Sequence, residues 1–262
     1  MAPGTYLELE LPPQVGIPSG EELKCTKGSN LQNEPICTDI SNKSKKEAAR
    51  TIKIEIVEQA RALVGPMSFS FTISSLQNPF STATTDSFKA TFMSKNNFAI
   101  AIQSSGITTS ASVPSPFKDI TVSRGSTENG ILTGYQLVVK LQNPAPNGSI
   151  LMVAMPSEIS VATLDGAAVD CAGRGSLKSS LECKLIGSQI VTSLAFSSVK
   201  VLESGESLEL EFFNIKNPIS LKPTESLSFD LKSSDGVYAI SAAHEGHKIT
   251  NTQASIILKA DV

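Results

Sequence analysis

Cysteine is the residue whose spacing in this chain points most clearly to chemistry. The four cysteines form two pairs of equal spacing, because Cys25 and Cys37 lie 12 residues apart, and so do Cys171 and Cys183. A structural zinc site usually takes two ligands from one C-x-x-C knuckle, and the sequence contains no such motif. The spacing therefore favours two local disulfides, which are typical of an oxidising compartment.

The two histidines are the other candidates for chemistry. His244 and His247 lie three residues apart beside a glycine, whereas a zinc-protease helix needs its two histidines four apart. A surface turn is the better interpretation, and no catalytic, metal or cofactor site is expected. Asp165 and Asp170 lack the remaining ligands of an EF-hand loop, so calcium is not expected there either. The sequence thus predicts that the protein is not an enzyme.

Two short motifs are acceptor sequences for N-linked sugar. They are Asn42-Lys-Ser and Asn147-Gly-Ser, and both fall in expected loops. We expect N- or O-linked glycans if the chain is exported. A lectin-like site is not favoured, because sugar rings stack on exposed aromatic platforms and the chain has no Trp and only three Tyr.

Composition indicates a folded chain with few charges. It has 262 residues, enough for two ordinary domains, with 40% hydrophobic and 18% charged residues. A formal charge of −3 offers no basic surface, so nucleic acid is not an expected partner. No apolar stretch approaches the roughly 18 residues of a membrane span, and the opening residues lack the apolar core of a signal peptide. We expect a soluble, extracellular, mature chain.

The sequence also repeats itself. Asn78-Pro79 recurs as Asn217-Pro218, 139 residues later, and the first cysteine pair recurs 146 residues later. Ile107-Thr108 likewise matches Ile249-Thr250 at an interval of 142. Shared landmarks in one order predict a duplicated domain, with residues 1–114 as the first copy and residues 115–262 as the second, divided near 113–116.

Within each copy the hydrophobic period is that of β-strands. Ile52, Ile54 and Ile56 alternate with charged residues, and similar alternation recurs at 69–73 and 208–212. Only residues 47–63 could pass for a helix, and their β-branched alternation favours a strand. We therefore predict two antiparallel β-sandwiches in tandem. Each Asn-Pro pair is expected to end a strand where the chain crosses to the other sheet.

The second copy resembles the tandem immunoglobulin-like repeats of large surface proteins of ciliates, oomycetes and other protists. The resemblance rests on Tyr135-Gln-Leu-Val-Val, Asn143-Pro-Ala-Pro-Asn-Gly, the strand 150–156, the cysteine pair and Ile215-Lys-Asn-Pro. Met155 and Leu11 stand where those repeats usually have phenylalanine. The resemblance implies an Ig-like fold and a secreted or cell-surface structural protein, and it brings no catalytic residues.

The first copy lacks the long lead that opens the second. Residues 117–147 hold two strand candidates before Pro156, whereas Pro12 is preceded by only eleven residues. A sandwich short of a strand exposes an apolar surface and unpaired backbone groups. The tail ASIILKADV, residues 254–262, could fill that place in another copy. Its alternate apolar residues form the expected subunit-contact strand: Ile256, Leu258, Ala260 and Val262.

These features predict the structural subunit of an extracellular filament or surface appendage, built head to tail from copies of the chain. Two alternatives stay open. The protein could be a monomeric adhesion or binding module whose tail is the last strand of its own domain. It could also be an excerpt of a longer tandem array, in which a neighbouring repeat supplies the strand.

Overall fold

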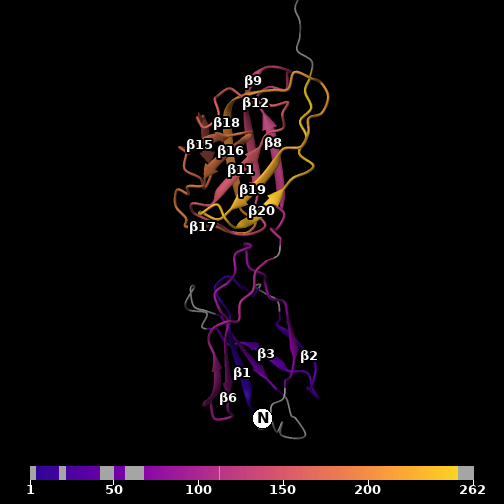
Figure 1. The fold of residues 1–262 in the computed structure, drawn as a ribbon, viewed down its shortest axis with the longest axis vertical. Helices are drawn as coiled ribbons and strands as arrows, with labels where there is room; N and C mark the ends of the chain where they lie inside the picture. Colours follow the sequence, from indigo (N-terminus) through magenta and orange to yellow (C-terminus); the bar gives the residue numbers. More distant parts are fainter. Residues whose placement is uncertain (1–3, 18–21, 42–49, 57–67, 112, 253–262) are drawn as a thin grey trace, which may run out of the picture. The chain divides into compact units, whose positions relative to one another are not determined.

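The chain folds as two compact units made of β-strands. The computed structural model describes residues 4–17, 22–41, 50–56, 68–111 and 113–252, and these residues contain strands, bridges and turns without a helix. The all-β prediction is confirmed. Unit 1 comprises Met1–Ser112 and unit 2 comprises Val113–Val262, so the division falls two residues before the expected one (Figure 1).

Unit 2 is an Ig-like sandwich of two antiparallel sheets. The first sheet has the strand order β13-β15-β16-β11-β19-β20. Its strands are β11 (Ile150–Ala154), β13 (Ala168–Val169), β15 (Cys183–Ile186), β16 (Gln189–Ser193), β19 (Ser228–Lys232) and β20 (Ala239–Ala243). The second sheet has the order β12-β18-β9-β8, with β14 also paired to β18. Its strands are β8 (Asp119–Arg124), β9 (Leu132–Lys140), β12 (Ser160–Val161), β14 (Cys171–Arg174) and β18 (Ser207–Lys216). A short ribbon joins β10 (Ala145–Pro146) to β17 (Val201–Leu202).

The core of unit 2 forms where the inner faces of these sheets meet. Alternate residues of each strand point inward, which buries Leu208, Leu210 and Phe212 of β18 almost completely. They pack in one cluster with Tyr135 of β9 and Phe229 of β19. The alternation read from the sequence at 208–212 is therefore the inward face of a central strand.

Unit 1 repeats this plan with fewer strands. One sheet has the order β3-β4-β1-β6-β7 and the other contains only β2 and β5 among the described residues. The strands are β1 (Tyr6–Glu10), β2 (Lys24–Lys27), β3 (Ile36–Asp39), β4 (Thr51–Glu55), β5 (Phe71–Ser74), β6 (Lys89–Met93) and β7 (Ala99–Gln103). The strand expected within residues 47–63 is thus confirmed as β4.

The registers of the two units match strand by strand. Leu9 of β1 lies opposite Ile52 and Ala90, and Val153 of β11 lies opposite the equivalent residues of β16 and β19. The pairs β6–β7 and β19–β20 even share an irregularity at the same place. The predicted duplication is therefore a duplication of structure.

One sequence match is wrong by two residues. Thr85 N–H donates to the carbonyl of Thr109, and the equivalent Thr224 N–H donates to the carbonyl of Ile249. Ile249 consequently corresponds to Thr109 and not to Ile107. The interval between Thr109 and Ile249 is 140, as it is between Ile100 and Ile240, whereas the matching two-letter phrase gave 142.

The Asn-Pro pairs stand where the sequence placed them. β18 ends at Lys216, Asn217 and Pro218 follow, and the chain then crosses to β19 in the opposite sheet. In unit 1 the chain passes Asn78 and Pro79 between β5 and β6, which also belong to different sheets. Proline cannot donate to a strand ladder, so it suits the end of the strand.

Candidate strand-accepting site

The central strand of the second sheet is paired differently in the two units. In unit 2, β18 pairs with β14 along one edge and with β9 along the other. In unit 1, β5 pairs with β2 in the register that β18 keeps with β14, because Cys25 faces Ile73 as Cys171 faces Phe212. Within the described part of unit 1, no strand occupies the edge of β5 that corresponds to the β9 side. The described residues agree with the prediction that unit 1 lacks its leading strands, which stays a prediction.

The missing partners leave an apolar surface, which we call the open face. Its six side chains belong to β1, β5, β6 and β7, and each has a nearly fully buried counterpart in unit 2. They are Leu7, Leu9, Phe71, Ile73, Phe92 and Ile100. The first five are partly exposed, and Ile100 is 60% exposed where its counterpart Ile240 is 1% exposed. Four of them, Leu7, Leu9, Phe71 and Ile73, still pack against the buried core of unit 1. Apolar side chains that stay partly exposed in this way are suited to contact with another chain.

The two Asn-Pro asparagines show the same contrast in polar contacts. Asn217 is 1% exposed, and its Oδ1 accepts hydrogen bonds from the Tyr135 hydroxyl at 2.7 Å and from Arg124 Nη1 at 3.1 Å. Its Nδ2 donates to the carbonyls of Ser126 and Glu128. All four partners lie on β8, on β9 or in the turn between them. Asn78, which corresponds to Asn217, is exposed.

Burial also tunes the hydroxyl that faces Asn217. Tyr135 is 1% exposed, and this burial raises the pKa of its hydroxyl above the usual value, although the nearby Arg124 guanidinium partly opposes the shift. The hydroxyl is therefore a neutral hydrogen-bond donor to Asn217 over a wide pH range. The cluster closes one end of the complete sheet.

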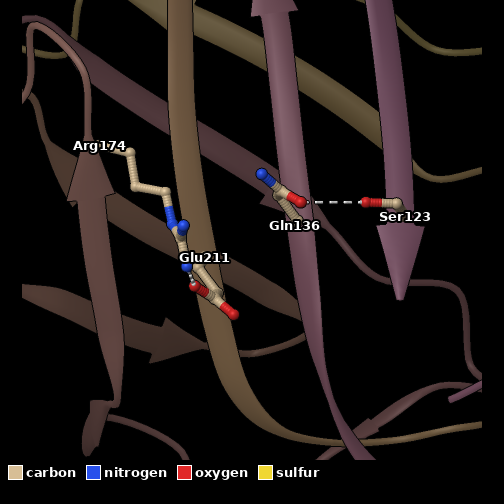
Figure 2. A network of polar contacts seen from close by, with 4 residues as sticks. All are labelled: Ser123, Gln136, Arg174 and Glu211. Carbon is tan, nitrogen blue, oxygen red and sulfur yellow. Dashed lines mark hydrogen bonds and ion pairs between the residues drawn. The ribbon is translucent and has the colours of Figure 1, made fainter. Parts of the chain in front are cut away.

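The outer surface of the complete sheet is polar. Figure 2 shows Arg174 of β14 extending over Glu211 of β18 as an ion pair, and Gln136 of β9 hydrogen bonded to Ser123 of β8 at 3.4 Å. These residues alternate with the buried ones along their strands. A strand that completes unit 1 must therefore present apolar residues on one side and solvent-compatible residues on the other.

Each unit carries one of the predicted disulfides. Cys25–Cys37 joins β2 to β3 with a Cα separation of 5.8 Å, and Cys171–Cys183 joins β14 to β15 with 6.2 Å. Each bond links the two sheets of its own sandwich. In unit 1 this bond ties the two-stranded ribbon, which is marginal by itself, to the larger sheet.

The proposed donor residues 256–262 lie outside the described residues, as does Asn42. Thr252 is the last described residue; its N–H donates to the Thr127 carbonyl at 2.8 Å, and Asn129 N–H donates to the Thr252 carbonyl at 3.2 Å. Thr252 is therefore held at the turn that joins β8 to β9.

The other candidate residues do not converge on one site. His244 Nε2 lies 3.4 Å from Asp230 Oδ1, while the His247 ring packs edge-on against Phe229. Asp165 accepts from the Gly187 N–H, and Asp170 contacts Asn214. Among the described residues no group of three His, Cys, Asp or Glu is placed to hold a metal. Asn147 is exposed, and its Oδ1 accepts from the Phe196 N–H.

Two contributors to the site were missed from the sequence. The sequence indicated no contact for the Asn143 side chain, whose Nδ2 donates to Ser115 Oγ and to the Ile240 carbonyl. Arg124, which joins Asn217, Asn251 and the Thr250 carbonyl, was not singled out. The one available signal was that Arg124, the last residue of β8, follows a run of short polar and apolar residues at 120–123.

In the described part of the chain, no helix is long and apolar enough to cross a membrane.

No family model matches the sequence, and no curated protein matches it. One similar solved structure is the C-terminal domain of the AgI/II polypeptide BspA from Streptococcus agalactiae. It has 10% sequence identity and a TM-score of 0.35, and the match covers 94% of this chain and 84% of that chain. A protein described as membrane-anchored, from Corynebacterium diphtheriae, has 9% identity and a TM-score of 0.28, covering 98% and 84%. Likeness at this level establishes no function, and the resemblance to protist repeats stays a prediction.

Proposed function

We propose that the protein is a structural subunit of an extracellular filament or surface appendage whose copies join head to tail. Residues 254–262 of one copy complete the second sheet of unit 1 in the next copy. The observation that carries this proposal is the edge of β5, because the same edge of β18 in unit 2 is covered by β9 over a nine-residue strand. Extended segments commonly bind proteins by adding a strand to such an edge.

The tail has the length and pattern that this edge requires. It contains nine residues, as β9 does, and its apolar side chains alternate with Ser255, Lys259 and Asp261. Alternation of this kind buries one side of the strand and leaves the other in water. A donor at one end of the chain and an acceptor in the other unit make a heterologous contact, which repeats into a fibre when it does not close.

The disulfides support the location. Structural disulfides persist in oxidising environments and are rare in the cytosol, so two of them in one chain favour a secreted or cell-surface protein. Asn147 is exposed and accessible to a glycan. The role proposed is mechanical and not enzymatic.

The test compares the full chain with a variant that lacks residues 254–262, by sedimentation velocity and negative-stain electron microscopy. The full chain forms long particles and the truncated chain stays monomeric. Leu258→Asp places a charge on the inward side and has the effect of the deletion, whereas Ile257→Asp, on the outward side, is the matched control and still assembles.

Other results select the alternatives. A full chain that stays monomeric at all concentrations and keeps unit 1 stable identifies a self-sufficient binding module. A monomer that assembles only after additional residues are attached before Met1 identifies a strand supplied covalently by a preceding repeat. Polymers that persist after the deletion and after Leu258→Asp refute donation by the tail.

A further inference from the structure

We propose that unit 2 carries a binding site for one ring of a neutral saccharide, in a groove beside the end of β18. This groove, which we call the bulge groove, has a volume of about 140 Å³ and lies between β12, β13 and β18. Its polar and aromatic lining consists of Asp170, Phe213 and Asn214, and its apolar lining includes Val161 and Val169. All of these residues belong to unit 2, so the site does not depend on how copies of the chain join.

A β-bulge in β18 turns two neighbouring side chains outward. Phe213 and Asn214 both lie opposite the single Gly134 of β9. A bulge of this kind adds one residue to a strand and redirects the side chains there. The residues on either side, Phe212 and Ile215, are buried, whereas Phe213 and Asn214 are exposed. The bulge therefore presents an aromatic ring and an amide side by side at the groove.

Unit 1 has the same backbone turn with different side chains. Asn214 has a φ of 59°, and the equivalent Ser75 has a φ of 65°. The ring, the carboxylate and the amide are nevertheless absent from unit 1, where the equivalent residues are Lys24, Ser74 and Ser75. The backbone that both units share therefore does not require this set of groups, which is a property of unit 2 alone.

Hydrogen bonds hold the polar groups of the bulge groove in place. Asn214 Nδ2 donates to Asp170 Oδ2 at 3.1 Å. The Phe213 N–H donates to the Asp170 carbonyl at 2.9 Å, and the Ala162 N–H donates to the Asn214 carbonyl at 3.0 Å. The bond between the two side chains uses one carboxylate oxygen and one amide hydrogen. The second carboxylate oxygen, the amide oxygen and the second amide hydrogen therefore remain for a ligand.

This combination of groups matches the chemistry of a pyranose. Adjacent hydroxyls of a sugar can donate to the Asp170 carboxylate and the Asn214 amide oxygen, and can accept from the amide hydrogen. The C–H face of the sugar can pack on the Phe213 ring, which is 36% exposed. A cavity of about 150 Å³ holds one benzene ring, so the bulge groove has room for one sugar ring. The shortage of Trp and Tyr counted against sugar binding, but the ring exposed here is a phenylalanine.

Other classes of ligand fit the bulge groove less well. The Asp170 carboxylate opposes an anion, and among the described residues no group of three His, Cys, Asp or Glu is placed to hold a metal. A cationic side chain is the strongest rival, because a carboxylate and an aromatic ring both attract it. An ammonium group can only donate hydrogen bonds, however, so it leaves the amide hydrogen of Asn214 without an acceptor. Hydroxyls satisfy both kinds of group.

Saturation-transfer NMR with the full chain tests the site. The probes are the methyl pyranosides of glucose, galactose, mannose and N-acetylglucosamine. We expect at least one of them to bind with a dissociation constant of roughly 1 mM, as suits one small ring in an open groove. Phe213→Ala and Asp170→Ala should each weaken binding by about tenfold. Phe213→Tyr keeps the ring and should retain binding. The double variant with Phe213→Ser and Asn214→Ser carries the residues that unit 1 accommodates on the same bulge, so its loss of binding cannot be a failure to fold.

Three results would overturn the proposal. The first is no saturation transfer to any of the four pyranosides at about ten times the expected dissociation constant. The second is binding that is unchanged in Phe213→Ala and in the double serine variant, which would place the sugar elsewhere on the chain. The third is preferential binding of N-acetyl-lysine methyl ester or N-acetyl-arginine methyl ester, which would assign the bulge groove to a cationic side chain.

Discussion

Replacing the asparagine of the repeated Asn-Pro phrase should lower the stability of unit 2 strongly and leave the stability of unit 1 nearly unchanged. In unit 2, Asn217→Ala removes the acceptor of the Tyr135 hydroxyl and one acceptor of Arg124. It also removes the donor to the carbonyls of Ser126 and Glu128. Arg124 keeps Asn251 Oδ1 and the Thr250 carbonyl, so its charge stays satisfied.

The magnitude follows from which groups are left without a partner. The Tyr135 hydroxyl is buried and cannot turn to water, and a buried polar group that loses its partner costs roughly 1–3 kcal/mol. The two carbonyls lie near the surface and recover part of their loss through hydration. We therefore expect Asn217→Ala to destabilise unit 2 by about 2–4 kcal/mol. Asn78→Ala changes an exposed side chain and should alter the stability of monomeric unit 1 by less than about 0.5 kcal/mol.

Hydrogen exchange with peptide-level mass spectrometry measures the two units separately in the full chain. Peptides from β9 and β18 report on unit 2, and peptides from β1 and β4 report on unit 1. Tyr135→Phe added to Asn217→Ala supplies the control, because it removes the orphaned hydroxyl and should restore part of the lost stability. Equal effects of Asn78→Ala and Asn217→Ala, or no recovery with Tyr135→Phe, would contradict the assignment of these contacts to the strands that unit 1 lacks.

Three further predictions use the same comparison of units. Ile240→Ala should cost about 2–5 kcal/mol in unit 2, whereas Ile100→Ala, at an exposed equivalent position, should cost under about 1 kcal/mol in the monomer, both measured by exchange. Replacing Cys25 and Cys37 by alanine opens a loop of about 13 residues and should cost unit 1 roughly 3 kcal/mol of stability. The yield of filaments should fall with it, whereas loss of the unit 2 disulfide should leave that yield nearly unchanged. Equal yields from the two variants would refute the acceptor role of unit 1. Burial lowers the pKa of His247, so the unfolded state binds the proton more readily than the folded state does. Unit 2 should therefore lose stability as the pH falls below about 6.5. Unfolding measured at several pH values should show a weaker pH dependence for His247→Gln.

Much of the architecture could be predicted from local patterns. The alternation at 52–56 identified a strand because a half-buried sheet has a period of two, and Ile52 and Ile54 are indeed fully buried. Equal cysteine spacing identified both disulfides because each closes a short loop between two strands that follow one another in the sequence. The duplication was visible because landmarks such as the cysteine pairs and the Asn-Pro phrases recur in one order.

The polar contacts of the site could not be predicted in the same way. Arg124 and Asn217 are 93 residues apart, and only the folded sheet brings them to 3.1 Å. Asn143 carries the same phrase as the strand-ending asparagines, yet its Nδ2 donates to Ser115 Oγ and to the carbonyl of Ile240 within β20. Short phrases report local backbone geometry, and the partner of a side chain depends on which distant strand lies beside it. The two-residue error at Ile249 has the same origin.

The amino acids on the open face argue that it is covered when the protein functions. A surface that faces water at all times is under no packing constraint, and exposed sheet edges are commonly protected by charges or proline. Unit 1 has Phe69, Phe71 and Phe92 where unit 2 has leucine, whereas it has Ile73 and Ala90 where unit 2 has phenylalanine, so large apolar side chains are kept on this side of unit 1 at changed positions. Side chains of this kind reduce free energy only when another chain covers them. Under the proposed function, unit 1 is the part of the sandwich that an incoming strand completes.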